Sequence, residues 1–287
     1  MNPNLWSENG VRSPPYRGLV RRLTSRAATA VPRRVQDLRS RRFASRLAGP
    51  KIMKAFAEAF PNAVFVEIGA NDGQQEDHLR QIIFSHRWKG VMVEPVPYVF
   101  ERLRANYKGV PEVRLENSAV ADRDGWLPFY HLAASPDYQR EGLPQWYDGI
   151  GSFSRDFVLA HERLIPDIAT RLIETRVPCL TFNSLCTKYE LDHVDLLLLD
   201  TEGYDYELLR HIDLRLHSPA LVVYEHYHLS RSDRVHSRAL MRGLGYDTLV
   251  EGFDTWCLRA GADERLTRTW RRLRPAVPEL CLEDEVR

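Results

Sequence analysis

Residues 64–73 read Val64-Phe-Val-Glu-Ile-Gly-Ala-Asn-Asp-Gly73, and they indicate how this chain begins to fold. The first five residues are branched or aromatic apart from Glu67, a pattern typical of a parallel strand that is covered on both faces. Gly69 and Gly73 let the backbone turn tightly after the strand and approach a ligand closely. Since a helical pattern follows at residues 75–87, we predict a strand, a binding loop and a helix in that order.

Apolar runs of strand length and helical patterns alternate along the rest of the chain. Further strands are expected at residues 90–94, 113–116, 194–200 and 220–225. Helices are expected at residues 97–107, 157–173 and 205–214. Two last runs flank the four-residue link from Glu251 to Asp254 and predict an antiparallel hairpin. Because alternating strands and helices form βαβ units, we predict an α/β fold with a doubly wound, mostly parallel sheet and a C-terminal antiparallel hairpin.

The composition excludes two broad classes of protein. A chain of 287 residues, 44% of them hydrophobic, can bury a large core and is not disordered throughout. No stretch approaches the ~18 consecutive apolar residues that cross a membrane, so we expect no membrane span. Four cysteines with no Cys-x-x-Cys pair argue against a disulfide scaffold and a structural zinc site. With no signal peptide recognised, we expect a cytoplasmic protein with reduced thiols.

Charge divides the chain into an arm and a body. Residues 1–50 hold eleven Arg, no Lys and two acidic residues, a net charge of +9, whereas the remaining 237 residues sum to −8. We predict a basic, partly disordered arm at 1–50 and one main domain at 51–287. The segment 33–60 is expected to form one or two basic helices that lead into this domain. The arm has three open interpretations: a dispensable tail, an organelle-targeting segment, or a binding site for an anionic partner.

An inserted segment at about residues 129–191 combines aromatic residues with glycine, among them Tyr138, Trp146 and Phe153. Such side chains suit the face of a sugar or another flat acceptor, although ordinary core packing explains them equally well. Single-stranded RNA also stacks on aromatic rings, but the negative charge of the body makes nucleic acid an unfavourable partner.

Acidic residues stand at the ends of three predicted strands, where an open α/β sheet binds its ligand. Glu67 precedes the glycine loop, and Asp200 ends the most hydrophobic strand. Glu94 and Pro95 end the second strand, at the distance from Gly69 at which a nucleotide fold presents a carboxylate to ribose hydroxyls. Glu67 would repel a pyrophosphate but attract an ammonium group. A cofactor with a ribose and an ammonium group but no phosphate is S-adenosylmethionine.

Four motifs carry a resemblance to a known family: VFVEIGANDG at 64–73, VEPVP at 93–97, ENSAVAD at 116–122 and VDLLLLDTEG at 194–203. Over roughly residues 60 to 230 the chain resembles the FkbM-type S-adenosylmethionine-dependent methyltransferases. The last motif is the specific one, because the family has a strand followed by Asp-x-Glu-Gly, which Asp200, Glu202 and Gly203 match. Leu199 stands where the family commonly has Lys.

The resemblance implies a seven-stranded, Rossmann-like class I methyltransferase sheet and O-methylation of a hydroxyl, often on a sugar or polyketide. It implies that Glu67, Gly69, Ala70, Asn71 and Gly73 hold the methionine end of the cofactor. It further assigns Glu94 and Pro95 to the ribose, Asn117, Ser118 and Ala119 to the adenine side, and Asp200 to the sulfonium. A side chain at Gly69 is expected to occupy cofactor space and to leave the fold intact.

Methyl transfer from a sulfonium is an in-line displacement, so the protein aligns the acceptor oxygen and removes its proton. The candidate catalytic residues are Asp200, Glu202, Glu225 and His226, and His226 is preferred as the base because a His titrates near neutral pH. Together with His228, these residues could also bind a divalent metal ion. We predict no metal, because no ligand spacing in the sequence requires one.

Three function classes follow from these observations. The preferred one is an S-adenosylmethionine-dependent O-methyltransferase that acts on a small molecule or a glycan. A nicotinamide-dependent oxidoreductase uses a similar sheet, but the GxGxxG pattern is absent after the first strand. The third is an inactive methyltransferase-fold binding protein that is recruited by its basic arm. The acceptor and the oligomeric state cannot be read from the sequence.

Overall fold

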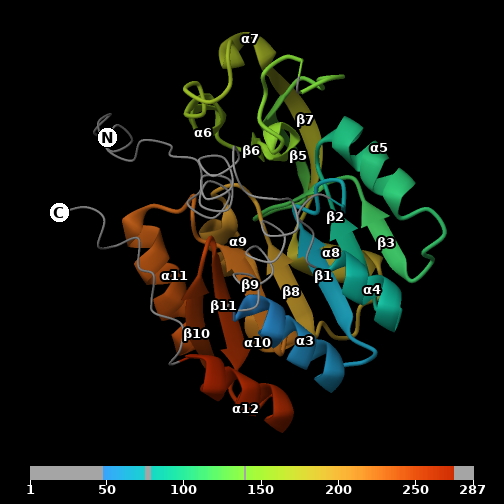
Figure 1. The fold of residues 1–287 in the computed structure, drawn as a ribbon, viewed down its shortest axis with the longest axis vertical. Coiled ribbons are helices and arrows are strands. Elements are labelled where there is room, and N and C mark those ends of the chain that lie inside the picture. Colours follow the sequence, from blue (N-terminus) through green and yellow to red (C-terminus); the bar gives the residue numbers. More distant parts are fainter. Residues whose placement is uncertain (1–47, 75–78, 139, 275–287) are drawn as a thin grey trace, which may run out of the picture.

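The main sheet of the protein has seven strands, in the order β10-β11-β9-β8-β1-β2-β3 (Figure 1). The structure is a computed structural model that describes residues 48–74, 79–138 and 140–274. The strands are β1 (Val64–Ile68), β2 (Lys89–Val93), β3 (Val113–Glu116), β8 (Leu196–Leu199), β9 (Leu221–Glu225), β10 (Tyr246–Glu251) and β11 (Asp254–Arg259).

Strand β1 lies at the centre of this sheet and pairs in parallel with β2 on one side and β8 on the other. Strands β3 and β9 extend the two sides in parallel, and β11 and β10 close one edge antiparallel. The predicted doubly wound, mostly parallel sheet with a C-terminal hairpin is therefore confirmed. Because the strand order reverses between β1 and β8, a ligand is expected outside the carboxyl ends of these two strands.

The hairpin differs in detail from the prediction. Glu251 pairs with Asp254, so both belong to the strands and only Gly252 and Phe253 form the turn. Gly252 has a φ of 65°, the left-handed conformation that two-residue hairpin turns commonly require. The predicted four-residue link is wrong for this reason, and Asp254 moves to the start of β11.

Helices cover both faces of the sheet. They are α3 (Gly49–Ala59), α4 (Arg80–His86), α5 (Pro97–Asn106), α8 (Phe182–Lys188), α9 (Asp205–His211), α10 (Leu214–His217), α11 (Arg231–Gly243) and α12 (Glu264–Leu273). Side chains of α3, α4, α5 and α12 share one hydrophobic cluster with Phe65, and those of α8, α9 and α11 share another with Val66. Since successive strand residues point to opposite faces, the two layers lie on opposite sides of the sheet.

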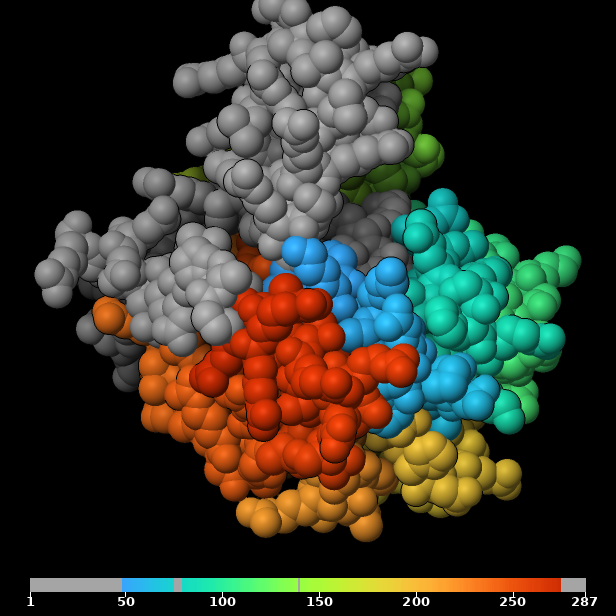
Figure 2. All heavy atoms as spheres, turned by 60° about the horizontal axis from the view of Figure 1, so that its bottom comes forward, coloured from blue at the N-terminus to red at the C-terminus, as the bar shows by residue number. Residues whose placement is uncertain are grey.

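Helix α3 begins the described part of the chain and packs beside α12, as Figure 2 shows in blue and red. Its residues Ile52 and Phe56 are fully buried, which fits the expectation that this segment enters the domain as an amphipathic helix. The remainder of the helical prediction for 33–60, together with most of the arm, lies outside the described residues.

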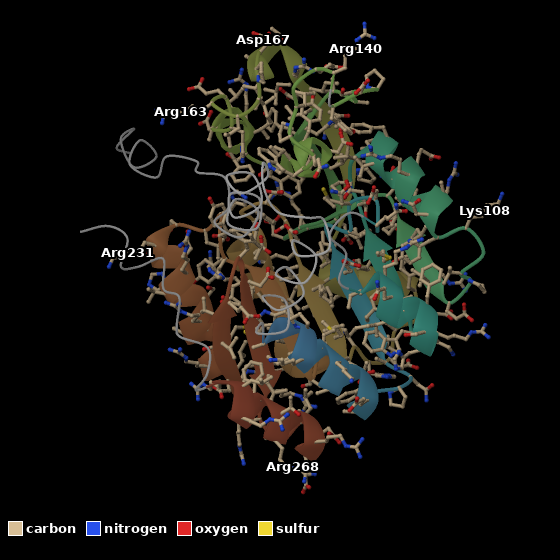
Figure 3. The ribbon with its side chains drawn as sticks, viewed as in Figure 1. Lys108, Arg140, Arg163, Asp167, Arg231 and Arg268 are labelled. Carbon is tan, nitrogen blue, oxygen red and sulfur yellow. The ribbon has the colours of Figure 1, made fainter. Side chains whose placement is uncertain are left out.

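A second, four-stranded sheet of order β4-β7-β5-β6 stands above the carboxyl ends of the main sheet (Figure 1). Its strands are β4 (Ala119–Val120), β5 (Gly125–Leu132), β6 (Gly151–Ser152) and β7 (Leu172–Leu180). The connection from β5 to β7 contains η1 (Tyr147–Gly149), α6 (Arg155–Leu159) and α7 (Ile168–Arg171). Figure 3 shows Arg163 and Asp167 at the outer end of this segment and Arg268 at the opposite end of the molecule.

The helix predicted at 157–173 is wrong. Helix α6 ends at Leu159, and Asp167 has a φ of 55° directly after Pro166, which cannot continue a helix. Leu172 then begins β7, which pairs antiparallel with β5 from Leu172 opposite Leu132 to Cys179 opposite Gly125. The pairing with β5 lies far away in the sequence, so the local apolar spacing could not reveal it.

Within the described ranges, no helix combines the length and the apolar character that a membrane crossing needs. The described cysteines, Cys179, Cys186 and Cys257, are buried and free.

Candidate functional site

The loop after β1 is held against its neighbours by backbone contacts. The N–H groups of Gly69 and Ala70 both donate to the Val93 carbonyl at 3.0 Å. Gly69 has a φ of 86°, and a Cβ atom on it would lie 1.8 Å from the carbonyl oxygen of Asp200. A side chain here meets the backbone after β8, so the expectation that it would fill cofactor space and spare the fold is corrected.

Gly73 serves a different purpose from the one predicted. A Cβ atom on Gly73 would lie 2.5 Å from the Tyr107 ring and 2.6 Å from the Leu103 side chain. The residue therefore lets the loop pack closely on α5. It is absent from the lining of the cavity described next.

A cavity of about 730 Å³ lies at the carboxyl ends of the parallel strands, beneath the second sheet. Eleven of the sequence-predicted site residues line it: Glu67, Gly69, Ala70, Asn71, Glu94, Pro95, Ser118, Ala119, Asp200, Glu202 and Glu225. Gly73, Asn117 and His226 do not. Strand ends that are far apart in the sequence thus meet around one space, as the rule for open α/β sheets requires.

The Glu94 carboxylate is fixed by the backbone on both sides. Its two oxygens accept the N–H groups of Asn71 at 3.0 Å and Val96 at 2.8 Å. Burial raises the pKa of Glu94 to about 7, against the lowering effect of these two hydrogen bonds. Glu94 therefore connects the loops after β1 and β2 and still borders the cavity.

Asn117 and Ser118 follow β3 and play separate parts. The Asn117 amide donates to the carbonyls of Glu94 at 2.8 Å and Pro95 at 3.3 Å, so Asn117 positions the loop from behind. Ser118 is fully buried and lines the cavity, and its Oγ has no hydrogen-bond partner within the described residues. Because a buried hydroxyl ordinarily finds a partner, Ser118 offers a polar contact to a ligand.

Carboxylates crowd the other end of the cavity, beside β8, β9 and β11. Burial, followed by the charges of Asp200 and Glu202, raises the pKa of Glu225 well above its ordinary value. Burial and the charge of Asp200 raise the pKa of Asp254 to about 8 and that of Asp205 to about 7. This end of the cavity is strongly acidic and suits a positively charged group.

Asp254 was missed by the sequence reasoning. It pairs with Glu225 across β11 and β9 and lines the cavity. The sequence analysis had placed it in the four-residue link between the last two strands, and only the two-residue turn brings it to the carboxyl end of β9. Glycine in a two-residue hairpin turn is a recognised sequence signal, so a turn at Gly252-Phe253 alone would have placed Asp254 in the last strand.

His226 lies away from the cavity. Its backbone N–H donates to the Phe253 carbonyl at 2.8 Å, and its Nδ1 lies 3.1 Å from the Thr255 hydroxyl. Burial, helped by the charges of Arg234 and Arg238, lowers the pKa of His226 to about 3. Since consecutive residues at a strand end point to opposite faces, His226 cannot share the orientation of Glu225. These contacts argue against our preference for His226 as the base.

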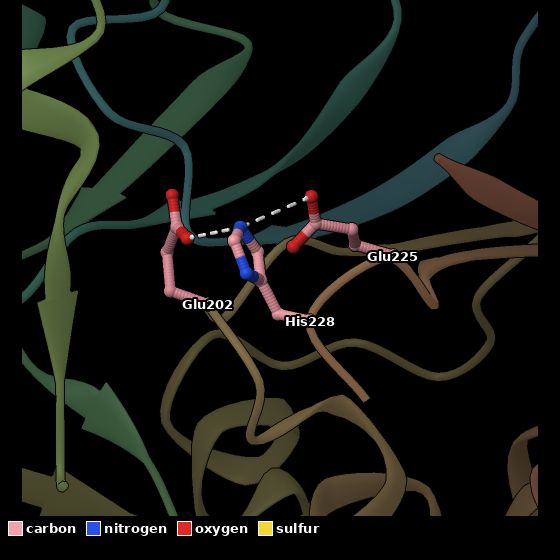
Figure 4. A group of neighbouring side chains, drawn as sticks. All are labelled: Glu202, Glu225 and His228. Carbon is pink, nitrogen blue, oxygen red and sulfur yellow. Dashed lines mark ion pairs between the residues drawn. The ribbon is translucent and has the colours of Figure 1, made fainter. Parts of the chain in front are cut away.

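His228, two residues after His226, is the histidine that approaches the predicted carboxylates. Its Nε2 lies 3.1 Å from Glu202 and 3.9 Å from Glu225, between the two carboxylates (Figure 4). The rings of Phe157 and Tyr227 each meet the imidazole edge to face at 4.9 Å between centroids. Aromatic packing therefore holds the ring, with its Nε2 facing both carboxylates.

The connection between β5 and β6 closes the cavity with a polar and aromatic wall. Tyr138, Trp146 and Asp148 line the cavity. Asp148 accepts the Tyr98 hydroxyl of α5 at 3.0 Å, and it also contacts Arg102 and Tyr138. This network ties the inserted segment to the main domain.

The site and the sheet together define a doubly wound α/β protein with a ligand cavity at the reversal of strand order. The chain matches the model of the Methyltransferase FkbM domain over residues 67–248. It therefore belongs to the FkbM methyltransferase family. The compared curated proteins include no match.

Solved structures give distant likenesses. The methyltransferase FkbM from Methylobacillus flagellatus KT is 11% identical with a TM-score of 0.42, over 69% of this chain and 44% of that one. An RNA methyltransferase from Salinibacter ruber, in complex with S-adenosyl-L-homocysteine, is 15% identical with a TM-score of 0.33, over 75% and 94%. A methyltransferase from Geobacter sulfurreducens is 12% identical with a TM-score of 0.38, over 83% and 96%.

Proposed function

We propose that this protein is an S-adenosylmethionine-dependent O-methyltransferase whose acceptor is a hydroxyl of a small molecule or a glycan. The observation that carries the proposal is the cavity at the carboxyl ends of β1, β2 and β8, bordered by Glu67, Glu94 and Asp200. Three carboxylates from three adjacent strands surround a space large enough for a nucleoside cofactor.

The chain's own residues fit such a cofactor. Glu94, fixed by two backbone N–H groups, accepts the two ribose hydroxyls. Glu67 attracts the ammonium group, and Ser118 supplies a buried hydroxyl on the adenine side, next to Ala119. Asn117 does not line the cavity; it orients the loop after β2, because its amide donates to the carbonyls of Glu94 and Pro95. When bound, the cofactor supplies an electrophilic methyl group on a sulfonium.

The acidic end of the cavity performs the remaining tasks. Asp200 borders the space between donor and acceptor and favours the positive charge of the sulfonium. The acceptor lies between the carboxylates and the wall formed by Tyr138 and Trp146, whose rings suit a sugar face. Asp200, Glu202 and Glu225 are the groups that receive the hydroxyl proton, in place of His226.

Two other classes are less well supported. An oxidoreductase would place a pyrophosphate beside the Glu67 carboxylate, which repels it. An inactive binding protein has no need for a carboxylate fixed in the cavity as Glu94 is. Recruitment by the basic arm remains a proposal about residues 1–50, of which the structure describes only the last three.

Calorimetric titration of the full chain with S-adenosylmethionine, S-adenosylhomocysteine, NAD and NADP tests the cofactor. We expect both sulfur compounds to bind and both nicotinamide compounds to fail. Binding of NAD without binding of S-adenosylhomocysteine would exclude the methyltransferase function. Transfer of a labelled methyl group to a panel of glycans and polyhydroxylated small molecules then tests the acceptor, and labelling of nitrogen acceptors alone would contradict O-methylation.

A further inference from the structure

We propose that Glu202, Glu225 and His228 bind a divalent transition-metal ion at the acceptor end of the cavity. One ligand atom from each residue lies within 4.8 Å of the other two. Glu202 and Glu225 line the cavity, and His228 stands between them (Figure 4). From the sequence, a metal at these residues was the less favoured alternative; we now favour it because the three side chains converge.

The separations suit coordination. Metal–ligand bonds to nitrogen and oxygen of about 2.1 Å put neighbouring ligands of an octahedral ion roughly 3.0 Å apart and opposite ones roughly 4.2 Å apart. The Nε2 of His228 lies 3.1 Å from the Glu202 oxygen and 3.9 Å from the Glu225 oxygen, within this interval. An ion at their centre therefore requires only small side-chain movements.

Ring contacts and a backbone turn orient His228 and Glu202 in the proposed ligand set. The His228 ring is held by Phe157 and Tyr227, so its direction is set by contacts outside the proposed ligand set. The Glu202 backbone has a φ of 53°, and Gly203 follows with a φ of 93°, so a tight turn brings Glu202 back toward His228. The side chain of His228 is 18% exposed, that of Glu202 20% and that of Glu225 12%. His228 is not part of the cavity lining, so the ligand set borders the cavity through its two carboxylates.

Charge favours a cation here. The second oxygen of Glu225 is buried and has no hydrogen-bond partner within the described residues. Asp200 and Asp254 line the same end of the cavity, so their carboxylates repel the Glu225 charge. Burying several like charges is unfavourable unless a cation balances them, and a divalent ion supplies two positive charges in one place.

The donor set identifies the class of metal. Ca²⁺ and Mg²⁺ prefer sites made of oxygen alone, whereas an imidazole combined with carboxylates suits Mn²⁺, Fe²⁺, Co²⁺ or Zn²⁺. Such an ion keeps open positions toward the cavity. If the proposed function holds, the acceptor hydroxyl binds there and loses its proton to a neighbouring carboxylate more readily, because a metal lowers the pKa of bound oxygen groups.

Titration of the full chain with Co²⁺, after removal of bound metal by a chelator, tests the site without any acceptor. We expect a visible absorption band typical of a mixed nitrogen and oxygen site. The variants Glu202→Gln, Glu225→Gln and His228→Gln should each weaken binding about tenfold or more, and His228→Gln should also shift the band. The matched controls are His226→Gln, two residues away and off the cavity, and Asp137→Asn, a cavity carboxylate outside the set. Both should bind Co²⁺ as the unmodified chain does.

Absence of Co²⁺ binding, or an unchanged band and affinity in His228→Gln, would overturn the proposal. Tight binding of Mg²⁺ or Ca²⁺ without Co²⁺ would contradict the assigned class of metal. Calorimetry with S-adenosylhomocysteine on the same variants shows that they are folded and keeps the two proposals separate. Weaker Co²⁺ binding in these variants with S-adenosylhomocysteine binding intact supports the metal site. An unmodified chain that binds S-adenosylhomocysteine but not Co²⁺ counts against the metal site alone.

Discussion

The two ends of the cavity hold their carboxylates in opposite ways. At the β1–β2 end, each oxygen of Glu94 accepts a backbone N–H group, so the carboxylate is fixed in place by the loops themselves. At the β8–β9 end, Glu225 faces Asp200, Glu202 and Asp254, and its surroundings are other negative charges. The first arrangement suits a neutral ligand with hydroxyl donors, and the second suits a cation or a proton in transfer. We therefore propose that this strand edge has a binding end, around Glu94, and a reactive end, around Glu225.

The junction of the two ends should be the most sensitive point. Gly69→Val should lower the free energy of unfolding by ~4 kcal/mol or more, because its Cβ would overlap the Asp200 carbonyl oxygen at a backbone conformation that β-branched residues avoid. Urea denaturation measures this loss. Gly109→Val is the matched control, since Gly109 has a similar φ of 89° with open space around it, and it should cost only about 1–2 kcal/mol. Equal losses in both variants would show that the close contact with Asp200 is unimportant.

Glu94→Gln tests the binding end. The amide cannot accept both backbone N–H groups and both ribose hydroxyls, so S-adenosylhomocysteine affinity should fall by ~2–4 kcal/mol in calorimetry. Glu202→Gln, at the reactive end, should leave this affinity nearly unchanged. If the two variants lose affinity equally, the division of the cavity into two ends is wrong.

Asp254→Asn tests the crowding at the reactive end through the pH dependence of stability. Asp254 has a folded-state pKa of about 8, above its ordinary value of 3.8, so between these values the folded protein holds a proton that the unfolded chain has released. Raising the pH across this window therefore favours unfolding, and asparagine removes the effect. The stability of the variant relative to the unmodified chain should increase by ~2 kcal/mol between pH 6 and pH 7.5. Urea titrations in the presence of a chelator measure it, and a constant difference would show that Asp254 is not desolvated.

Removal of residues 1–30 should have the smallest effect. This stretch has no apolar face, so the free energy of unfolding and that of S-adenosylhomocysteine binding should each stay within about 0.5 kcal/mol of the full chain, with little change in the melting temperature. Differential scanning calorimetry and titration check both quantities. A large fall in the melting temperature would show that the arm contributes to the stability of the domain, in addition to the two ends of the cavity.

The main sheet could be predicted because its signals are local. Continuous apolar runs, the glycines after the first strand and the acids at the strand ends lie within short segments such as 64–73 and 194–203. Strand ends of a parallel sheet meet at one edge, so the predicted residues Glu67, Glu94 and Asp200 border one cavity.

What only the tertiary structure decided depends on contacts between distant segments or on the direction of side chains. The pairing of β5 with β7 was not predicted, because the partner strand lies about fifty residues away and local apolar spacing carries no signal of it. That His228 approaches Glu202 while His226 lies beside Thr255 depends on the direction of each ring after β9, which the sequence does not give. The sequence by itself therefore determined the main sheet, the family and five of the acids around the cavity, namely Glu67, Glu94, Asp200, Glu202 and Glu225. The packing of the second sheet and the tight turn at Gly252 decided which of those residues face one another, because orientation arises only when separated elements pack together.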